Sequence, residues 1–434
     1  MKELVYEQLN ETIYTETLDN GLKVYLLSKP EMAKTYGIFG TNYGSIDQTF
    51  TPIGNEETVN VPEGIAHFLE HKLFEKEDRD VFQDFTKLGA SANAFTSFTK
   101  TAYLFSATNH IEKNVETLLD FVQDPFFSDE SVEKEKGIIA QEIRMYDDQP
   151  DWRAFFGTIQ SLYHEHPVKI DIAGTVDSIQ KITKEDLYTC YETFYHPSNM
   201  SLFIAGDIDP EKMMEQIKNN QSSKSFAKEE EIKRSYPDEP DHVAKSFDSI
   251  EMPVSTSKCM VGIKEKVKGL RGEDILRSEL LSGMILSHYF SKSGEFYEEL
   301  YQNDLIDDSF HFETDLDVEF GFTIIGGDSR KPDELADRIK EMLHQLKDQK
   351  IDPEDFERMK RKKIGHFLRA MNSMEFIANQ FSHYHLLGVD LFEVLPTIES
   401  LTIDDATAFL EHWIKEDRIA VFQVKPAASE KHAG

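Results

Sequence analysis

The sequence repeats one pattern in its two halves. Residues 182–207 and residues 401–426 align at an offset of 219 residues, and each copy reads as a helix, a turn and a strand. The aligned pairs include Thr183 with Thr402, Asp186 with Asp405, Phe194 with Trp413 and Leu202 with Val421. A second match, at an offset of 224, joins residues 128–145 to residues 352–370, each an acidic start followed by a long helix. The repeat predicts two homologous domains.

Strand and helix patterns mix along the first half. The stretch "TLDNGLKVYLL" (residues 17–27) predicts two strands joined by an Asn-Gly turn. Further strands are expected in residues 36–47 and 101–109, and helical periodicity occurs in residues 62–77, 80–88, 110–123 and 129–147. The pattern predicts an α+β fold in which each domain is a mixed sheet packed with helices.

A polar, charged stretch near the middle of the chain, residues 219–245, contains two prolines and is typical of a linker. We therefore expect one domain over residues 1–222, a linker over residues 223–245 and a second domain over residues 246–434.

Composition excludes several classes of protein. Acidic residues outnumber basic ones by 80 to 47, for a net charge of −33, so neither nucleic acid nor an anionic membrane is an expected partner. The two cysteines have no paired spacing, and we find no signal-peptide core and no run of 18 apolar residues. A soluble, cytoplasmic protein is expected.

The stretch "GIAHFLEHKLFEKE" (residues 64–77) places His67 and His71 four residues apart on a predicted helix, with Glu70 between them. Imidazoles at i and i+4 lie on the same face and can bind one zinc ion, while Glu70 can hydrogen-bond a water on that ion. The order H-x-x-E-H inverts the familiar H-E-x-x-H motif. The same spacing also fits two histidines on a helix surface.

A catalytic zinc ion needs a third protein ligand and an open position. The helix predicted over residues 129–147 offers Glu135 and Glu142, seven residues apart, with Ile138 between them on the same face. Carboxylates on an otherwise apolar face are costly unless they meet a cation. The second copy lacks these groups, because Met359 and His366 stand at the corresponding positions.

Five stretches together resemble a pitrilysin-type inverzincin zinc metallopeptidase, in the processing-peptidase branch and closest to bacterial members that occur as paired subunits. They are "GIAHFLEHKLFE", "GASANAFTSFTKTAYLF", "EKEKGIIAQEIRMYDDQPDW", "HPVKIDIAGTVDSIQKIT" and "FYHPSNMSLFIAGDID". The resemblance implies a chain that forms half of a clamshell. It implies zinc on His67, His71 and Glu142, with Glu70 as general base and Glu135 supporting the site.

The resemblance also gives the strand around residues 91–105 a role. It implies that a peptide substrate adds to this sheet edge, contacting Asn93, Ala94, Phe95 and Thr96. From the residues alone, an ordinary exposed edge strand explains the pattern equally well. The pairs His164/His166 and His383/His385 have His-x-His spacing but fall outside the motifs, so we do not expect them to bind the metal.

The sequence departs from the family in its second half. Active members commonly carry an Arg and, seven residues later, a Tyr that hold substrate and stabilise the oxyanion, but Tyr301 and Asp308 stand near these positions. We therefore expect the zinc-bearing subunit of a heterodimer, with a related subunit supplying the Arg and Tyr. The predicted function is a zinc-dependent endopeptidase acting on extended peptides. The alternative is a non-catalytic peptide-binding or assembly subunit of the same fold.

Overall fold

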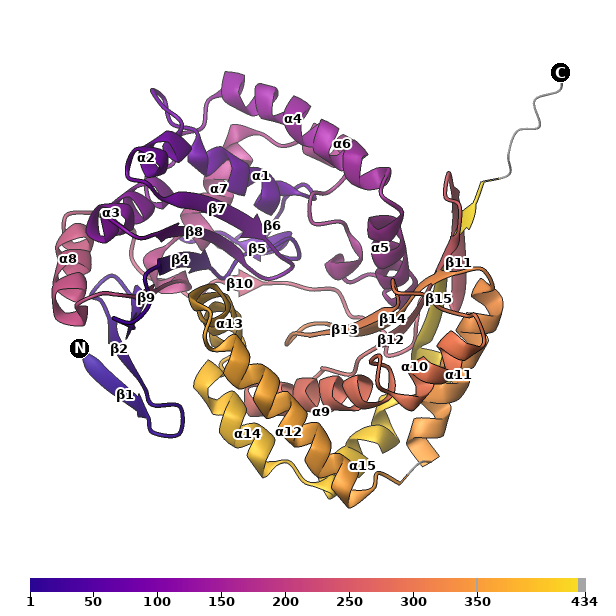
Figure 1. Cartoon of the computed structure of the whole chain (residues 1–434). Coiled ribbons are helices and arrows are strands. Elements are labelled where there is room, and N and C mark those ends of the chain that lie inside the picture. Colours follow the sequence, from indigo (N-terminus) through magenta and orange to yellow (C-terminus); the bar gives the residue numbers. More distant parts are fainter. Residues whose placement is uncertain (349, 428–434) are drawn as a thin grey trace.

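The computed structural model describes residues 1–348 and 350–427, which form two helix-flanked sheets lying side by side (Figure 1). The first sheet has the order β1 (Lys2–Tyr6), β2 (Glu11–Thr17), β3 (Lys23–Ser28), β9 (Met200–Gly206), β4 (Thr35–Thr41), β8 (Thr101–Ala107) and β7 (Ser91–Thr96). The second has the order β11 (Phe247–Met252), β15 (Ile419–Pro426), β12 (Ser257–Lys264), β14 (Gly321–Ser329) and β13 (His311–Leu316). The predicted α+β class is confirmed.

The two sheets share one topology. The order β3-β9-β4-β8-β7 matches β11-β15-β12-β14-β13, and in both series the first pair is parallel and the other pairs are antiparallel. Two helix-capping residues lie at the same offset of 219 residues as the sequence repeat. Thr183 and Thr402 cap equivalent helices through capping boxes with Asp186 and Asp405, because each side chain satisfies an otherwise unpaired backbone N–H. The chain therefore contains two homologous α/β units.

The helices of the first half lie close to their predicted ranges, including the one expected over residues 129–147. They are α1 (Ile65–Phe74), α2 (Val81–Lys87), α3 (Ile111–Val122), α4 (Asp129–Asp147), α5 (Pro150–Leu162), α6 (Val176–Ile179), α7 (Lys184–Phe194) and α8 (Pro210–Ser222). The second half has α9 (Glu273–Tyr289), α10 (Glu295–Gln302), α11 (Pro332–Asp348), α12 (Pro353–Ala370), α13 (Met374–Leu386), α14 (Val394–Ser400) and α15 (Ile403–Trp413). None of the helices in the described ranges has the length and apolar composition needed to cross a bilayer.

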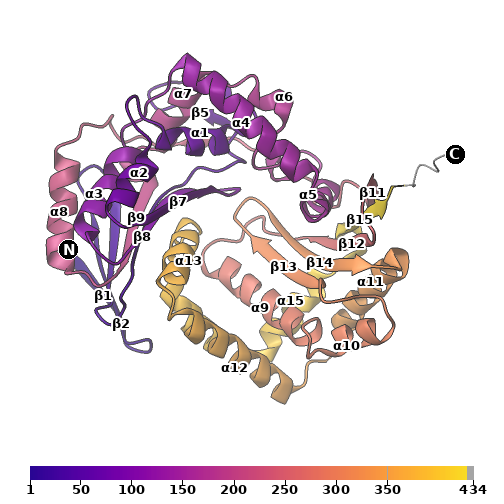
Figure 2. The same ribbon diagram turned by 45° about the horizontal axis from the view of Figure 1, so that its top comes forward.

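One helix from each half of the chain packs on the sheet of the other half. Helix α5 packs on β12 and β15, where a Cβ at Gly157 would lie 2.2 Å from the Phe422 ring. Helix α13 packs on β4 and β9, with the Phe381 ring 4.5 Å from that of Phe203 (Figure 2). The sheet of each half is therefore covered in part by a helix that belongs, in sequence, to the other half.

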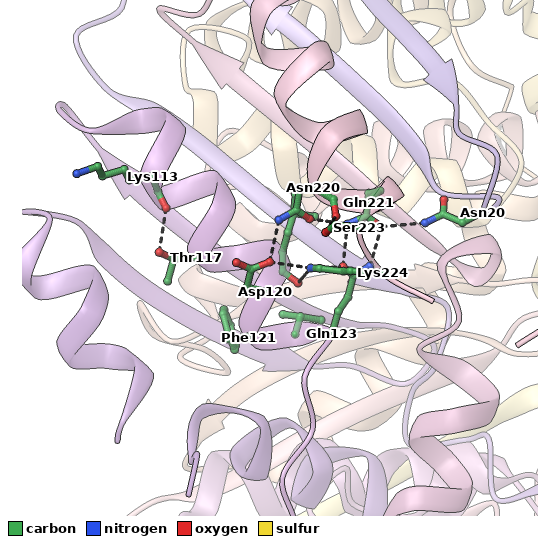
Figure 3. A network of polar contacts seen from close by, with 12 residues as sticks. Asn20, Lys113, Thr117, Asp120, Phe121, Gln123, Asn220, Gln221, Ser223 and Lys224 are labelled. Carbon is green, nitrogen blue, oxygen red and sulfur yellow. Dashed lines mark hydrogen bonds and ion pairs between the residues drawn. The ribbon is translucent and has the colours of Figure 1, made fainter. Parts of the chain in front are cut away.

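The segment predicted as a linker is bonded along its length. At its start, Asn220 donates to Asp120 (2.8 Å) and Lys224 pairs with the same carboxylate (2.8 Å), which ties the end of α8 to α3 (Figure 3). Further on, β10 (Lys233–Arg234) pairs with β5 (Thr49–Thr51), which also pairs with β6 (Val59–Asn60). Glu239 then accepts three backbone N–H bonds from residues 164–166 (2.8–2.9 Å). These bonds hold the connection against the first half, and the backbone N–H of Val243 donates to the carbonyl of Asp417 in the second half (2.9 Å).

Candidate active site

Helix α1 begins where only glycine fits. Gly64 has a φ of 84°, and a Cβ there would lie 2.3 Å from the carbonyl oxygen of Ala173. Phe68, Leu69 and Leu73 are buried in the core of the first half, which fixes the rotation of the helix. His67 and His71 consequently face Glu142 of α4, and Glu70 faces β7; α4 and β7 are two of the elements packed against α1.

His67, His71 and Glu142 converge at one point. His67 Nε2 lies 3.7 Å from Glu142 Oε1, His71 Nε2 lies 3.6 Å from Glu142 Oε2, and all three donor atoms fall within 4.8 Å of one another. They form the only group of three or more potential ligands found within residues 1–348 and 350–427. The separations exceed a direct hydrogen bond, yet two ligands of one tetrahedral zinc ion lie roughly 3.4 Å apart given metal–ligand bonds of about 2.1 Å. The donor set therefore fits a single zinc ion.

Glu135 orients the second histidine. His71 Nδ1 donates to Glu135 Oε1 (3.1 Å), which leaves Nε2 as the free nitrogen turned toward Glu142. Burial alone would lower the pKa of His71, but this hydrogen bond and the charges of Glu70, Glu135 and Glu142 raise it. Burial and the neighbouring His71 lower the pKa of His67 to about 3, so that imidazole is neutral, the form that binds zinc.

Glu70 is linked to the edge strand of the first sheet. Burial raises the pKa of its carboxyl group, although Thr96 Oγ1 donates to Glu70 Oε2 (2.8 Å) and opposes the rise. Thr96 closes β7, which has β8 on one side and, among the described residues, no strand on the other. At the exposed side of this strand the backbone N–H of Ala94 donates to Asn93 Oδ1 (2.9 Å). Of the predicted substrate residues 93–96, Thr96 is the one in direct contact with Glu70.

Two features of α4 differ from what the sequence suggests. The expectation that Ile138 shares an apolar face with Glu135 and Glu142 is wrong, because Ile138 is 46% exposed while Ile139 and Ile143 are buried instead. Sequence reasoning also missed Tyr146, one turn after Glu142. Burial and Glu142 raise the pKa of its phenol, and its ring stacks on Trp152 at 4.6 Å. The sequence alone could have indicated Tyr146, because it follows Glu142 by four residues on the same predicted helix and therefore lies on the same face.

The other candidate histidines pack against neighbouring rings. The rings of His164 and His166 contact His242 and Tyr236, and His385 contacts Tyr25. In the second copy, Met359 is buried and His366 is exposed. Tyr301 is 57% exposed, and Asp308 pairs with Lys292 (2.7 Å).

Parts of the sequence match known protein families. The sequence model described as Insulinase (Peptidase family M16) matches residues 55–176, and that described as Peptidase M16 inactive domain matches residues 181–363. YmfH of Bacillus subtilis, named an uncharacterized zinc protease, is 53% identical over 98% of this chain and 99% of its own length. The chain belongs to peptidase family M16.

Solved structures share the fold over nearly the whole chain. An M16-like peptidase from Alicyclobacillus acidocaldarius superposes with a TM-score of 0.92 at 41% identity, covering 96% of this chain and 99% of its own. A protease from Helicobacter pylori has the same fold, with a TM-score of 0.82 at 21% identity over 95% of this chain and 99% of its own. The M16 chain is thus similar to a named zinc protease over 98% of its length. The insulinase match contains His67, His71 and Glu142.

Proposed function

We propose that this M16 chain is a zinc-dependent endopeptidase that hydrolyses extended or unfolded peptides. The observation that carries the proposal is the convergence of His67, His71 and Glu142 beside Glu70, which is hydrogen-bonded to a sheet edge through Thr96. Three protein ligands leave one position open, as in catalytic rather than structural zinc sites. Every proposed catalytic residue lies in the proposed first domain, residues 1–222.

Zinc bound by these three residues would lower the pKa of a bound water to about 7 and polarise the scissile carbonyl. Residues of this chain would transfer the protons and orient the zinc ligands. Glu70 accepts the proton from the attacking water and returns it to the leaving amine, and its raised pKa suits both directions of transfer. Glu135 holds His71 in the tautomer that presents Nε2.

The free side of β7 supports an extended substrate. A peptide added along this edge would hydrogen-bond to backbone groups, in place of the present bond from Ala94 N–H to Asn93 Oδ1. Asn93, Ala94, Phe95 and Thr96 are the proposed substrate contacts. Main-chain recognition is tolerant of sequence, so unfolded segments are the expected substrate class.

We propose that the chain acts in the cytoplasm as the zinc-bearing half of a clamshell-shaped heterodimer. Two observations support a partner and this compartment. Asp308 would repel an oxyanion and Tyr301 carries no positive charge, so a related subunit would supply the Arg and Tyr of active relatives. The buried free cysteines Cys190 and Cys259 are compatible with a reducing compartment.

The test is cleavage of unstructured peptides by the zinc-loaded chain, alone and with the related subunit, with Glu70→Gln as the matched control. Cleavage that requires the partner and disappears in Glu70→Gln supports the proposal. Absence of cleavage by both preparations, despite one zinc ion per chain, would favour the alternative of a non-catalytic peptide-binding or assembly subunit.

A further inference from the structure

Lys100 is a buried cation that pairs with no carboxylate in the part of the chain that the structure describes. It lies in the turn between β7 and β8, is 6% exposed, and its Nζ lies 5.0 Å from the centre of the Phe95 ring. Within the described residues, Lys100 Nζ has no hydrogen bond and no ion pair. The other five buried lysines, by contrast, each bond a carboxylate or a backbone carbonyl; they are Lys72, Lys76, Lys136, Lys258 and Lys264.

An isolated buried ammonium group is unfavourable, and the surroundings of Lys100 do not relieve it. Burial lowers the pKa of Lys100 to about 8, with no acidic neighbour to raise it again. The other titratable group beside it is His383 on α13, whose pKa falls to about 4 through burial and the charge of Lys100. A ring face compensates only part of the desolvation of an ammonium group. Lys100 therefore remains a cation that an incoming anion would stabilise.

Lys100 also lies on a defined face of the proposed substrate edge. Along β7, Ala92 and Ala94 pack on the core of the first half, and Thr96 on the same face bonds Glu70. Phe95 points to the opposite face and packs against the core of the second half, with Lys100 over its ring. A peptide strand added to β7 would turn every second side chain toward Phe95 and Lys100.

We propose that Lys100 is a specificity-determining residue, which selects a substrate carboxylate on the Phe95 side of the added strand. The inference rests on the proposed use of β7 as the substrate edge and names a preference within that function. The long aliphatic stem of Lys100 beside Phe95 can pack against the carbon atoms of an Asp or Glu side chain. The carboxylate would supply the missing counter-charge.

Binding of peptides to the full-length Glu70→Gln chain tests this inference without relying on cleavage. A neutral peptide with blocked ends would carry one Glu at each position in turn, and its affinity would be compared with that of the Gln peptide by fluorescence anisotropy. We expect one position at which Glu binds at least about tenfold more tightly than Gln, and no gain at its two neighbours, because adjacent side chains face opposite ways.

Variants of the lysine complete the test. Lys100→Met should abolish the preference, so that the Glu and Gln peptides bind with equal affinity, and Lys100→Arg should retain the preference. Lys87→Met, at an exposed lysine on neighbouring α2, is the matched control and should behave like the unsubstituted chain. Peptides without Glu but with a free C-terminal carboxylate show whether a chain end is the favoured source of the anion.

Equal affinities for Glu and Gln at every position and for free and blocked ends, or a preference that survives Lys100→Met, would overturn the inference. If Lys100→Met lowers the melting temperature of the chain, its binding result is set aside. The inference is then tested by Lys100→Arg, which should keep the preference for Glu, and by Lys100→Gln, which should lose it. Cleavage by the chain with intact Glu70 is scored separately. Cleavage without any charge preference refutes the role of Lys100 alone, whereas a charge preference in binding without cleavage refutes the peptidase proposal alone.

Discussion

The partly buried carboxyl group of Glu265 should make the stability of the second half depend on pH. Glu265 Oε1 accepts hydrogen bonds from Thr323 Oγ1 (2.6 Å) and Trp413 Nε1 (2.7 Å). Burial raises its pKa from 4.5 to about 7, because the loss of hydration outweighs these two donors and the charge of Arg418. In Glu265→Gln the amide oxygen can accept both bonds, but the side chain cannot ionise.

The sign and size of the effect follow from the two pKa values. Between pH 4.5 and pH 7 the folded chain keeps a proton that the unfolded chain has lost, so the free energy of unfolding falls as the pH rises. At about 1.4 kcal/mol for each pKa unit, the penalty grows by roughly 2–3 kcal/mol between pH 5 and pH 8. Glu265→Gln should therefore be close to the unsubstituted chain in stability at pH 5 and more stable by about that amount at pH 8.

Urea denaturation of both proteins, followed by far-ultraviolet circular dichroism at pH 5 and pH 8, measures this difference. All other titratable groups are the same in both proteins. The difference between the two unfolding free energies therefore reports on Glu265 alone. A difference in unfolding free energy that does not change with pH would refute the reasoning.

Three further changes test other parts of the structure. Glu135→Ala should weaken zinc binding by about 10- to 100-fold in competition titrations, because His71 loses its orienting partner, whereas exposed Glu130→Ala should not. Gly157→Val should lower the free energy of unfolding by about 1–3 kcal/mol or more in thermal denaturation, since its Cβ would meet the Phe422 ring, while Gly137→Ala on α4 has open space and should stabilise slightly. Thr96→Val removes a hydrogen bond that favours ionised Glu70, so the acidic limb of the pH–rate profile should move to higher pH.

Sequence periodicity located the elements that carry the site. The capping residues Ser128 and Asp352 preserve the offset of 224, and α4 spans the whole predicted range, because caps and apolar spacing are local properties. Spacing alone could not select Glu142 as the partner of the two histidines, since one chain has 80 acidic residues to choose from. Helix spacing restricts the candidates to a face, and tertiary packing selects among them.

Other features depend on contacts that no local pattern records. An amphipathic pattern shows that α5 and α13 bury one face, but it does not show that each packs on the sheet of the other half. Ile138 is exposed although it lies between two site carboxylates, because the apolar stripe of α4 runs through Ile139 and Ile143. The missing counter-ion of Lys100 likewise becomes visible only when its surroundings in space are known.

The most direct test of the central claim is the zinc content of the purified chain and of two variants, measured together with peptide cleavage in the presence of the related subunit. We predict one zinc ion per chain for the unsubstituted protein and for Glu70→Gln, with cleavage by the former only, and loss of both zinc and cleavage in Glu142→Gln. Full zinc occupancy in Glu142→Gln, or undiminished cleavage by Glu70→Gln, would contradict the account.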